Sequence, residues 1–114
     1  MEQQRPERAH YRIQYPVNER PRLIVAGREY EVLNCSEKGV CFLAPGTHRF
    51  VLDGAVQGVI RFSRGHEAEV DGRVVRIEGA LVALHLAVQP IPFRIVLDEQ
   101  RFLRQKYPMW PREV

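Results

Sequence analysis

The chain has 114 residues and a formal net charge of +3, with 45% hydrophobic and 27% charged residues. This length is enough for one hydrophobic core and too short for two ordinary domains. No apolar run approaches the ~20 residues that span a membrane, and the first residues lack the apolar core of a signal peptide. We therefore expect one soluble, cytoplasmic domain without membrane insertion.

Residues 1–19 are polar, contain two prolines and show no sustained periodicity, which predicts a flexible, extended N-terminal arm. Arg8 and Arg12 lie four residues apart in this arm. A guanidinium group can donate paired hydrogen bonds to phosphate oxygens or to the N7 and O6 edge of guanine. The two arginines are therefore candidates for an anion clamp, and the alternative is a pair of solvated charges.

Six segments from residue 20 onward have the alternation and the turn boundaries that are typical of β-strands. Gly72 lies inside the fifth segment and predicts a β-bulge there. We predict a mainly β domain over residues 20–114, a closed antiparallel six-stranded barrel of the split-barrel type, because closure removes exposed sheet edges. The segments are Arg22–Val25, Glu29–Leu33, Val40–Ala44, Ala55–Phe62, Ala68–Ile77 and Ala80–Ala87.

Apolar residues recur at helical spacing over residues 92–106, after two prolines that end the strand pattern. This spacing predicts an amphipathic C-terminal helix that lies across the barrel or its open end. The segment 107–111 that follows is unusually apolar for a terminus. It either packs onto the same domain or forms a docking patch for another chain.

A short polar loop, Asn34–Gly39, separates two of the predicted strands. The side chains of Asn34 and Ser36 can hold such a turn by bonding to nearby backbone groups. Gly39 can adopt a positive φ without steric cost, and it can let a ligand approach without a Cβ in the way. The loop can therefore present polar groups on a rigid rim.

The RxxxR arm is followed about twenty residues later by an NxSxxG loop between two strands. This combination resembles the PilZ domain family, whose known members bind cyclic di-GMP between an arginine arm and a [D/N]xSxxG loop. The resemblance covers nearly the whole chain, because the later strands and the closing helix also fit. It implies that the ligand contacts Arg8, Arg12, Asn34, Ser36 and Gly39.

Two further residues are weaker candidates for the nucleotide site. His10 lies between the arm arginines, where its ring would stack on guanine or only seat the arm against the barrel. Arg76 follows Arg73 by three residues, so the two face opposite sides of a regular strand. One of them could face the ligand, and the alternative is a solvated barrel exterior.

The chain departs from common family forms at two positions. Ala9 rather than a second arginine directly follows Arg8, which leaves the affinity and the number of bound nucleotides open. Ala83 stands in the last strand where the family often has glycine, and we interpret this as a variation in packing.

The resemblance implies a cyclic di-GMP receptor whose arm becomes ordered over the loop and which signals to a protein partner. The rival hypothesis is a PilZ-like interaction adaptor in motility or secretion machinery that does not need the nucleotide. Retention of both motifs favours the receptor. A nucleic acid polymer fits poorly as a partner, because the strands lack the exposed aromatic platform on which bases stack.

Catalysis has no positive support in the sequence. The four histidines are scattered, and no two of them have metal-ligand spacing on one element. Cys35 and Cys41 provide neither a disulfide framework nor a metal motif, so we expect free thiols. No Gly-rich phosphate loop opens a helix. We therefore predict a binding protein with no catalytic residues, no metal and no cofactor other than its nucleotide ligand.

Overall fold

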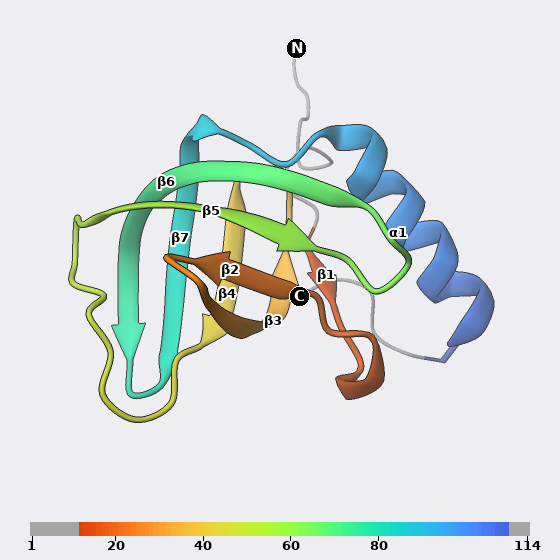
Figure 1. Ribbon diagram of the computed structural model, residues 1–114. Coiled ribbons are helices and arrows are strands. Elements are labelled where there is room, and N and C mark those ends of the chain that lie inside the picture. Colours follow the sequence, from red (N-terminus) through yellow and green to blue (C-terminus); the bar gives the residue numbers. More distant parts are fainter. Residues whose placement is uncertain (1–11, 110–114) are drawn as a thin grey trace, which may run out of the picture.

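The computed structural model describes residues 12–109 and confirms the predicted fold class. Six antiparallel strands close into a barrel, with one extra strand and one C-terminal helix beside it (Figure 1). Around the barrel the strands follow the order β3, β2, β5, β6, β7, β4, and pairing of β3 with β4 closes the ring. The strands are β1 (Ile13–Gln14), β2 (Arg22–Val25), β3 (Arg28–Cys35), β4 (Gly39–Leu43), β5 (Ala55–Arg61), β6 (Glu67–Glu78) and β7 (Leu81–Gln89).

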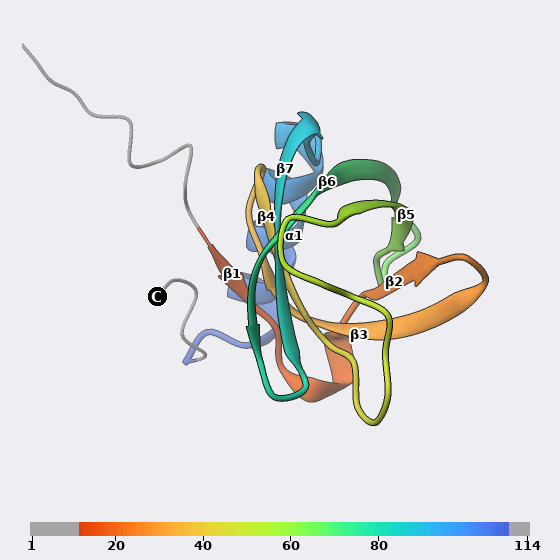
Figure 2. The same ribbon diagram turned by 90° about the vertical axis from the view of Figure 1, so that its left-hand side faces the viewer.

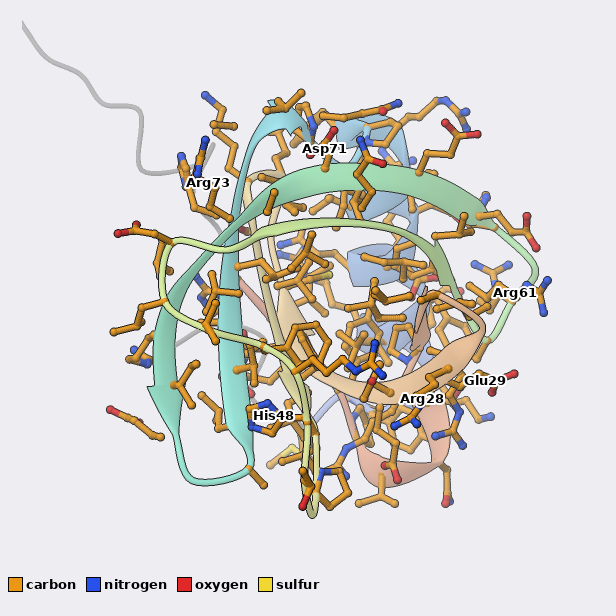
Figure 3. All side chains as sticks on the ribbon, turned by 60° about the vertical axis from the view of Figure 1, so that its left-hand side comes forward. Arg28, Glu29, His48, Arg61, Asp71 and Arg73 are labelled. Carbon is orange, nitrogen blue, oxygen red and sulfur yellow. The ribbon has the colours of Figure 1, made fainter. Side chains whose placement is uncertain are left out.

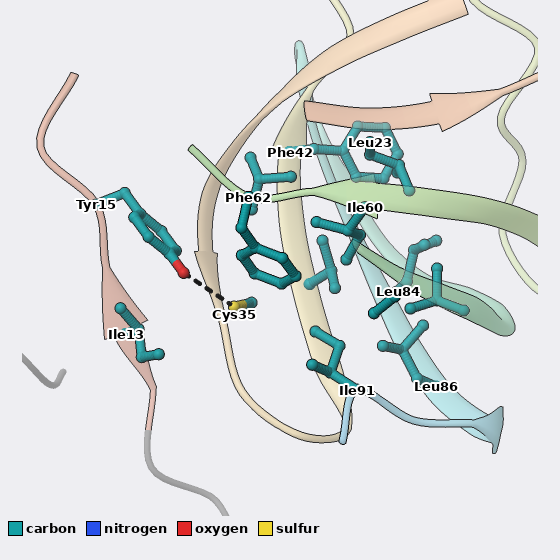
Figure 4. Packing of buried hydrophobic residues seen from close by; sticks show 14 of the residues in the cluster. Ile13, Tyr15, Leu23, Cys35, Phe42, Ile60, Phe62, Leu84, Leu86 and Ile91 are labelled. Carbon is teal, nitrogen blue, oxygen red and sulfur yellow. Dashed lines mark hydrogen bonds between the residues drawn. The ribbon is translucent and has the colours of Figure 1, made fainter. Parts of the chain in front are cut away.

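The barrel interior is filled by side chains that alternate along each strand, as strand geometry requires. Val32 and Phe42 are cross-strand partners in β3 and β4, and both are fully buried. Figure 4 shows how residues from distant segments meet in this core. Its largest fully buried apolar members include Leu23, Ile60, Leu86, Ile91, Ile95 and Leu103.

Helix α1 (Phe93–Lys106) forms where the sequence predicted a helix. It lies at one side of the barrel, beside β1 (Figures 1 and 2). Ile95, Val96 and Leu103 form its buried stripe. The backbone N–H of Ile91, just before the helix, donates to the carbonyl oxygen of Glu37 at 2.8 Å. Within residues 12–109, no helix is long and apolar enough to cross a membrane.

The described part of the predicted arm, residues 12–19, is packed on the barrel rather than extended away from it. β1 pairs with the end of β3, with Ile13 opposite Cys35. Ile13 and Tyr15 are buried, and the Tyr15 hydroxyl lies 3.9 Å from the Cys35 sulfur (Figure 4). The structure differs from the prediction here because two apolar side chains at strand spacing suffice to seat a short segment, although its surroundings in sequence are polar.

Tyr15 also joins the arm to the helix, because its hydroxyl donates a hydrogen bond of 2.7 Å to Oε1 of Glu99. Glu99 is fully buried, and its Oε2 has no hydrogen-bond partner within the described residues. Burial raises the pKa of Glu99, although the hydrogen bond from Tyr15 opposes this change. The contact links the residue directly after β1 to α1.

A second carboxylate, Glu19, forms the other end of this arm–helix junction. It ends the 3-10 helix Val17–Glu19 and is almost fully buried. It accepts hydrogen bonds from Ser63 at 3.0 Å, Lys106 at 2.9 Å and Tyr107 at 2.8 Å. Burial would raise the pKa of Glu19, but these three hydrogen bonds outweigh it and lower the pKa below its ordinary value.

The beginning of the apolar tail packs onto the domain, because Tyr107 contacts the core and bonds to Glu19. Met109 is 93% exposed. Trp110 and Pro111 lie outside the described residues, so the alternative of a docking patch for another chain stays a prediction.

Candidate functional site

The site lies on the outer face of the barrel, where four strands place one residue each in a continuous row. Asn34 of β3 pairs with Cys41 of β4, Cys41 pairs with Ala83 of β7, and Ala83 pairs with Arg76 of β6. The ends of this row are polar and its centre is made of small side chains. The row therefore forms a shallow floor between two hydrogen-bonding walls.

Arg12 crosses from the arm to the loop at one end of this floor. Its Nη1 donates a hydrogen bond of 2.7 Å to Oδ1 of Asn34, which is 22 residues further along the chain. Arm and loop are therefore in contact at these two residues, and closure of the arm over a ligand stays a prediction. Asn34 accepts from the arginine, whereas we expected its side chain to hold the turn.

The loop itself is held by backbone groups. The Ser36 N–H donates to the Gly39 carbonyl oxygen at 2.8 Å and closes the turn. The Lys38 carbonyl oxygen accepts from the Leu86 N–H at 2.8 Å, and the Glu37 carbonyl oxygen accepts from Ile91. These bonds attach the loop to β7 and to the segment before α1.

Glycine at position 39 is explained by the space around it and not by a positive φ. Its φ lies outside the positive region, so backbone conformation does not require glycine here. A Cβ at this position would lie 3.1 Å from Nη2 of Arg12 and 3.4 Å from Oγ of Ser36. Glycine therefore provides the space in which the arginine side chain approaches the loop.

Arg73 and Arg76 were expected to face opposite sides of their strand, and this expectation is wrong. β6 has irregular register against β7 at Asp71/Arg73, which confirms the bulge predicted at Gly72, and again at Val74/Arg76. The second irregularity leaves both arginines exposed on the outer face. Arg76 reaches the floor, with its Nη2 4.0 Å from the Cys41 sulfur.

These residues enclose a cavity of about 400 Å³, a volume within the range of small-ligand sites. Asn34, Ser36, Gly39, Arg12 and Arg76 all line it, and no carboxylate does. Arg8 and His10 lie outside the described residues. Five of the seven predicted site residues are therefore gathered in one cavity.

Sequence reasoning missed several residues that line the same cavity. Lys38 could have been predicted as a lining residue, because it lies within the loop motif. His85 and Ala83 lie on β7, and their place beside the loop depends on the register between β7 and β4. The other residues that sequence reasoning did not place in the site are Gln14, Val40, Cys41, Val75 and Leu84.

The cavity has the charge of an anion site. Arg12 is half-buried and bonds to a neutral amide, and no carboxylate pairs with it within residues 12–109. Arg76 has an exposed partner, Glu78, at 3.8 Å, and such a pair is weakened by solvent. A ligand with phosphate oxygens would therefore find donors whose charge is not already matched.

The two thiols are free and buried, as predicted. Burial raises the pKa of Cys35 to about 12, so its thiol stays protonated at neutral pH and is not a nucleophile. Cys41 contributes a small apolar group to the cavity floor. Within the described residues, no group of three histidine, cysteine or acidic side chains is arranged to hold a metal ion.

Two comparisons with known proteins bear on identity. No curated protein matches the chain. A family model described as the PilZ domain matches residues 6–104, which include both motifs, all six barrel strands and most of α1. The chain therefore belongs to the PilZ domain family.

Proposed function

We propose that this chain is a cyclic di-GMP receptor that binds the nucleotide in the outer cavity between its arm and its NxSxxG loop. PilZ is a family of binding and adaptor domains known for this ligand, and not a family of enzymes. The observation that carries the proposal is the 2.7 Å bond between Arg12 and Asn34, because it joins one residue of the arm motif to one residue of the loop motif beside the cavity.

The chemistry of the cavity suits each part of this ligand. The guanidinium fork of Arg12 would donate to a phosphate or to the N7 and O6 edge of a guanine. Arg76 would supply a second cation on the opposite side of the floor. The small side chains of Cys41 and Ala83 leave room for a flat base to lie on the sheet.

The proposal includes a movement of the arm. Residues 12–19 are already packed on the barrel, so the bound nucleotide would draw in the residues before Arg12, and Arg8 would then close over the ligand. Arg12 directly precedes β1, whose neighbour Tyr15 bonds to Glu99 of the helix. A change at Arg12 would therefore reach a surface that a protein partner could recognise.

Isothermal titration with cyclic di-GMP tests the proposal, with GTP as the ligand control. The variant is Arg12→Ala, and the matched control is Arg104→Ala, because Arg104 is an exposed arginine on α1 away from the cavity. Loss of two charge-assisted hydrogen bonds corresponds to about 3 kcal/mol or more, so we expect affinity to fall by about a hundredfold or more.

The expected result is saturable heat for the native chain and for Arg104→Ala, strong weakening for Arg12→Ala, and no heat with GTP. The number of bound nucleotides follows from the same titration. Absence of heat at high nucleotide concentration would refute the receptor and favour an adaptor that works without the nucleotide.

A further inference from the structure

A second cavity, of about 490 Å³, lies at the mouth of the barrel. It is bounded by the turn between β2 and β3 and by the connection of residues 44–54 between β4 and β5. It shares no lining residue with the nucleotide cavity. The two cavities lie on opposite faces of β6, since Val74 lines the mouth and Val75 lines the outer site.

The wall of the mouth is a cluster of aromatic rings. Tyr30, Phe42 and Phe50 pack in tilted and edge-to-face arrangements, with centroid separations of 5.1 to 5.5 Å. Each ring contacts the other two, and Tyr30 and Phe50 line the cavity. His48 packs against Phe50 from the solvent side, at 5.6 Å between ring centroids, and lies on the connecting loop in Figure 3.

Two arginines, Arg28 and Arg49, line this cavity, and no carboxylate does. Arg28 lies two residues before Tyr30 in β3, so it shares the face that points toward the mouth, whereas Glu29 points outward (Figure 3). Within residues 12–109, neither arginine has an ion-pair partner. The mouth therefore carries unmatched positive charge.

Apolar surface continues from the cavity onto the connecting loop. Val51 lines the cavity and is 62% exposed, and the adjacent Leu52 is 63% exposed. Asp53, next in the chain, adopts a positive φ of 65°. Large aliphatic side chains held at an exposed turn beside a cavity are typical of a surface that a partner covers.

We propose that the barrel mouth is a docking site for an acidic segment of a protein partner, with one apolar side chain of that segment inserted against Tyr30 and Phe50. Acidic side chains of the segment would pair with Arg28 and Arg49. A protein segment suits this surface, because exposed apolar side chains lie in the cavity lining and also next to it. The apolar surface extends from Val51, in the cavity lining, to Leu52, which lies outside it.

The test is selection of a phage-displayed library of random short peptides on the purified full-length chain, without nucleotide. Synthetic copies of the enriched peptides are then titrated by fluorescence anisotropy against the double variant Arg28→Glu/Arg49→Glu. The matched control is Arg104→Glu, an exposed charge reversal on α1. All three proteins are also titrated with cyclic di-GMP, which separates this inference from nucleotide binding.

We expect enriched peptides that combine acidic residues with an aromatic or aliphatic residue. Charge reversal at the mouth should weaken them at least about tenfold, because like charges then face each other across the contact, and Arg104→Glu should not. Leu52→Asp should weaken them as well. Failure to enrich any peptide, enrichment without acidic residues, or equal affinity for the double variant would each overturn the proposal, whatever the nucleotide titration gives.

Discussion

The outer cavity and the arm–helix junction are both polar and partly buried, but their charges are arranged in opposite ways. At the junction, the Glu19 carboxylate receives three donors, one of them the ammonium of Lys106. In the cavity, the Arg12 guanidinium bonds to an amide and no carboxylate lines the wall. The Glu19 carboxylate is therefore matched by donors of the same chain, whereas the cavity leaves cationic donors available.

This difference assigns the two regions different tasks. Matched charge fixes the arm and the helix to the barrel and contributes to stability. Unmatched charge contributes little to stability, because Arg12 remains partly solvated, but it is available to an anionic ligand. Changes at the junction should therefore alter stability and leave affinity unchanged, and changes in the cavity should do the reverse.

The largest expected effect on stability is that of Glu19→Ala. The substitution removes three hydrogen bonds to a buried carboxylate, and we expect a loss of about 3 kcal/mol in the free energy of unfolding. Urea denaturation measures this loss. The control is Glu67→Ala, which breaks an exposed pair with Arg61 and should cost less than about 1 kcal/mol. A fall in cyclic di-GMP affinity as large as that of Arg12→Ala would contradict the division of tasks.

The next largest effect is expected for Ala83→Leu in the cavity. The longer side chain would fill the floor between Asn34 and Arg76, so nucleotide affinity should fall by about a hundredfold, which is about 2.7 kcal/mol. Stability should change little, because the added group points out of the barrel. Ala87→Leu, on the same strand and exposed, is the matched control and should keep full affinity in the same titration.

A smaller effect is expected for Gly39→Ala. Its Cβ would press against the Arg12 guanidinium, whose flexible end must shift away from Asn34. We expect affinity to fall about tenfold, which corresponds to about 1.4 kcal/mol. A double-mutant cycle with Arg12→Ala checks the cause. If glycine acts through the arginine, the two losses will not add, and full additivity would show that Gly39 acts in another way.

The smallest effect concerns the two carboxylates of the junction and depends on pH. The pKa of Glu19 is lowered, so its stabilising contribution is present above its ordinary value of 4.5 and is lost as the pH falls through the lower folded value. The pKa of Glu99 is raised, so its contribution is present below 4.5 and is lost as the pH rises through the higher folded value.

Glu19→Gln and Glu99→Gln should therefore have opposite pH profiles. Relative to the native chain, Glu19→Gln should lose stability at neutral pH and recover in acid. Glu99→Gln should gain relative stability as the pH rises, by on the order of 1 kcal/mol for each unit of pKa shift. Urea denaturation at several pH values between about 3 and about 8 measures both stability profiles. Parallel profiles would refute the opposite pKa shifts of Glu19 and Glu99.

The sequence predicted the features that local patterns determine. α1 has its predicted bounds because helical periodicity and two prolines define it, and all six barrel strands lie where alternation and turn residues predicted them. The meeting of Arg12 with Asn34 was predictable only through the family resemblance, since no local pattern relates residues that far apart.

Other features depend on contacts that no single segment encodes. β1 is two residues long, and it is stabilised by pairing with β3 and by the helix. The bulge at Val74/Arg76, which turns Arg76 outward, arises from the register of β6 against β7. The register of β7 against β4 likewise decides that Ala83 and His85 lie beside the loop, so the cavity floor could not be predicted from the sequence.

Closure of the barrel has a consequence for folding kinetics. It requires β4 to pair with β7 and β2 with β5, and these strands are far apart in the sequence. Such long-range pairing is slow to form. The outer cavity, where we propose that the nucleotide binds, needs all four of β3, β4, β6 and β7 in register, so it exists only after closure. A bound nucleotide should therefore slow unfolding of the barrel while leaving its folding rate nearly unchanged.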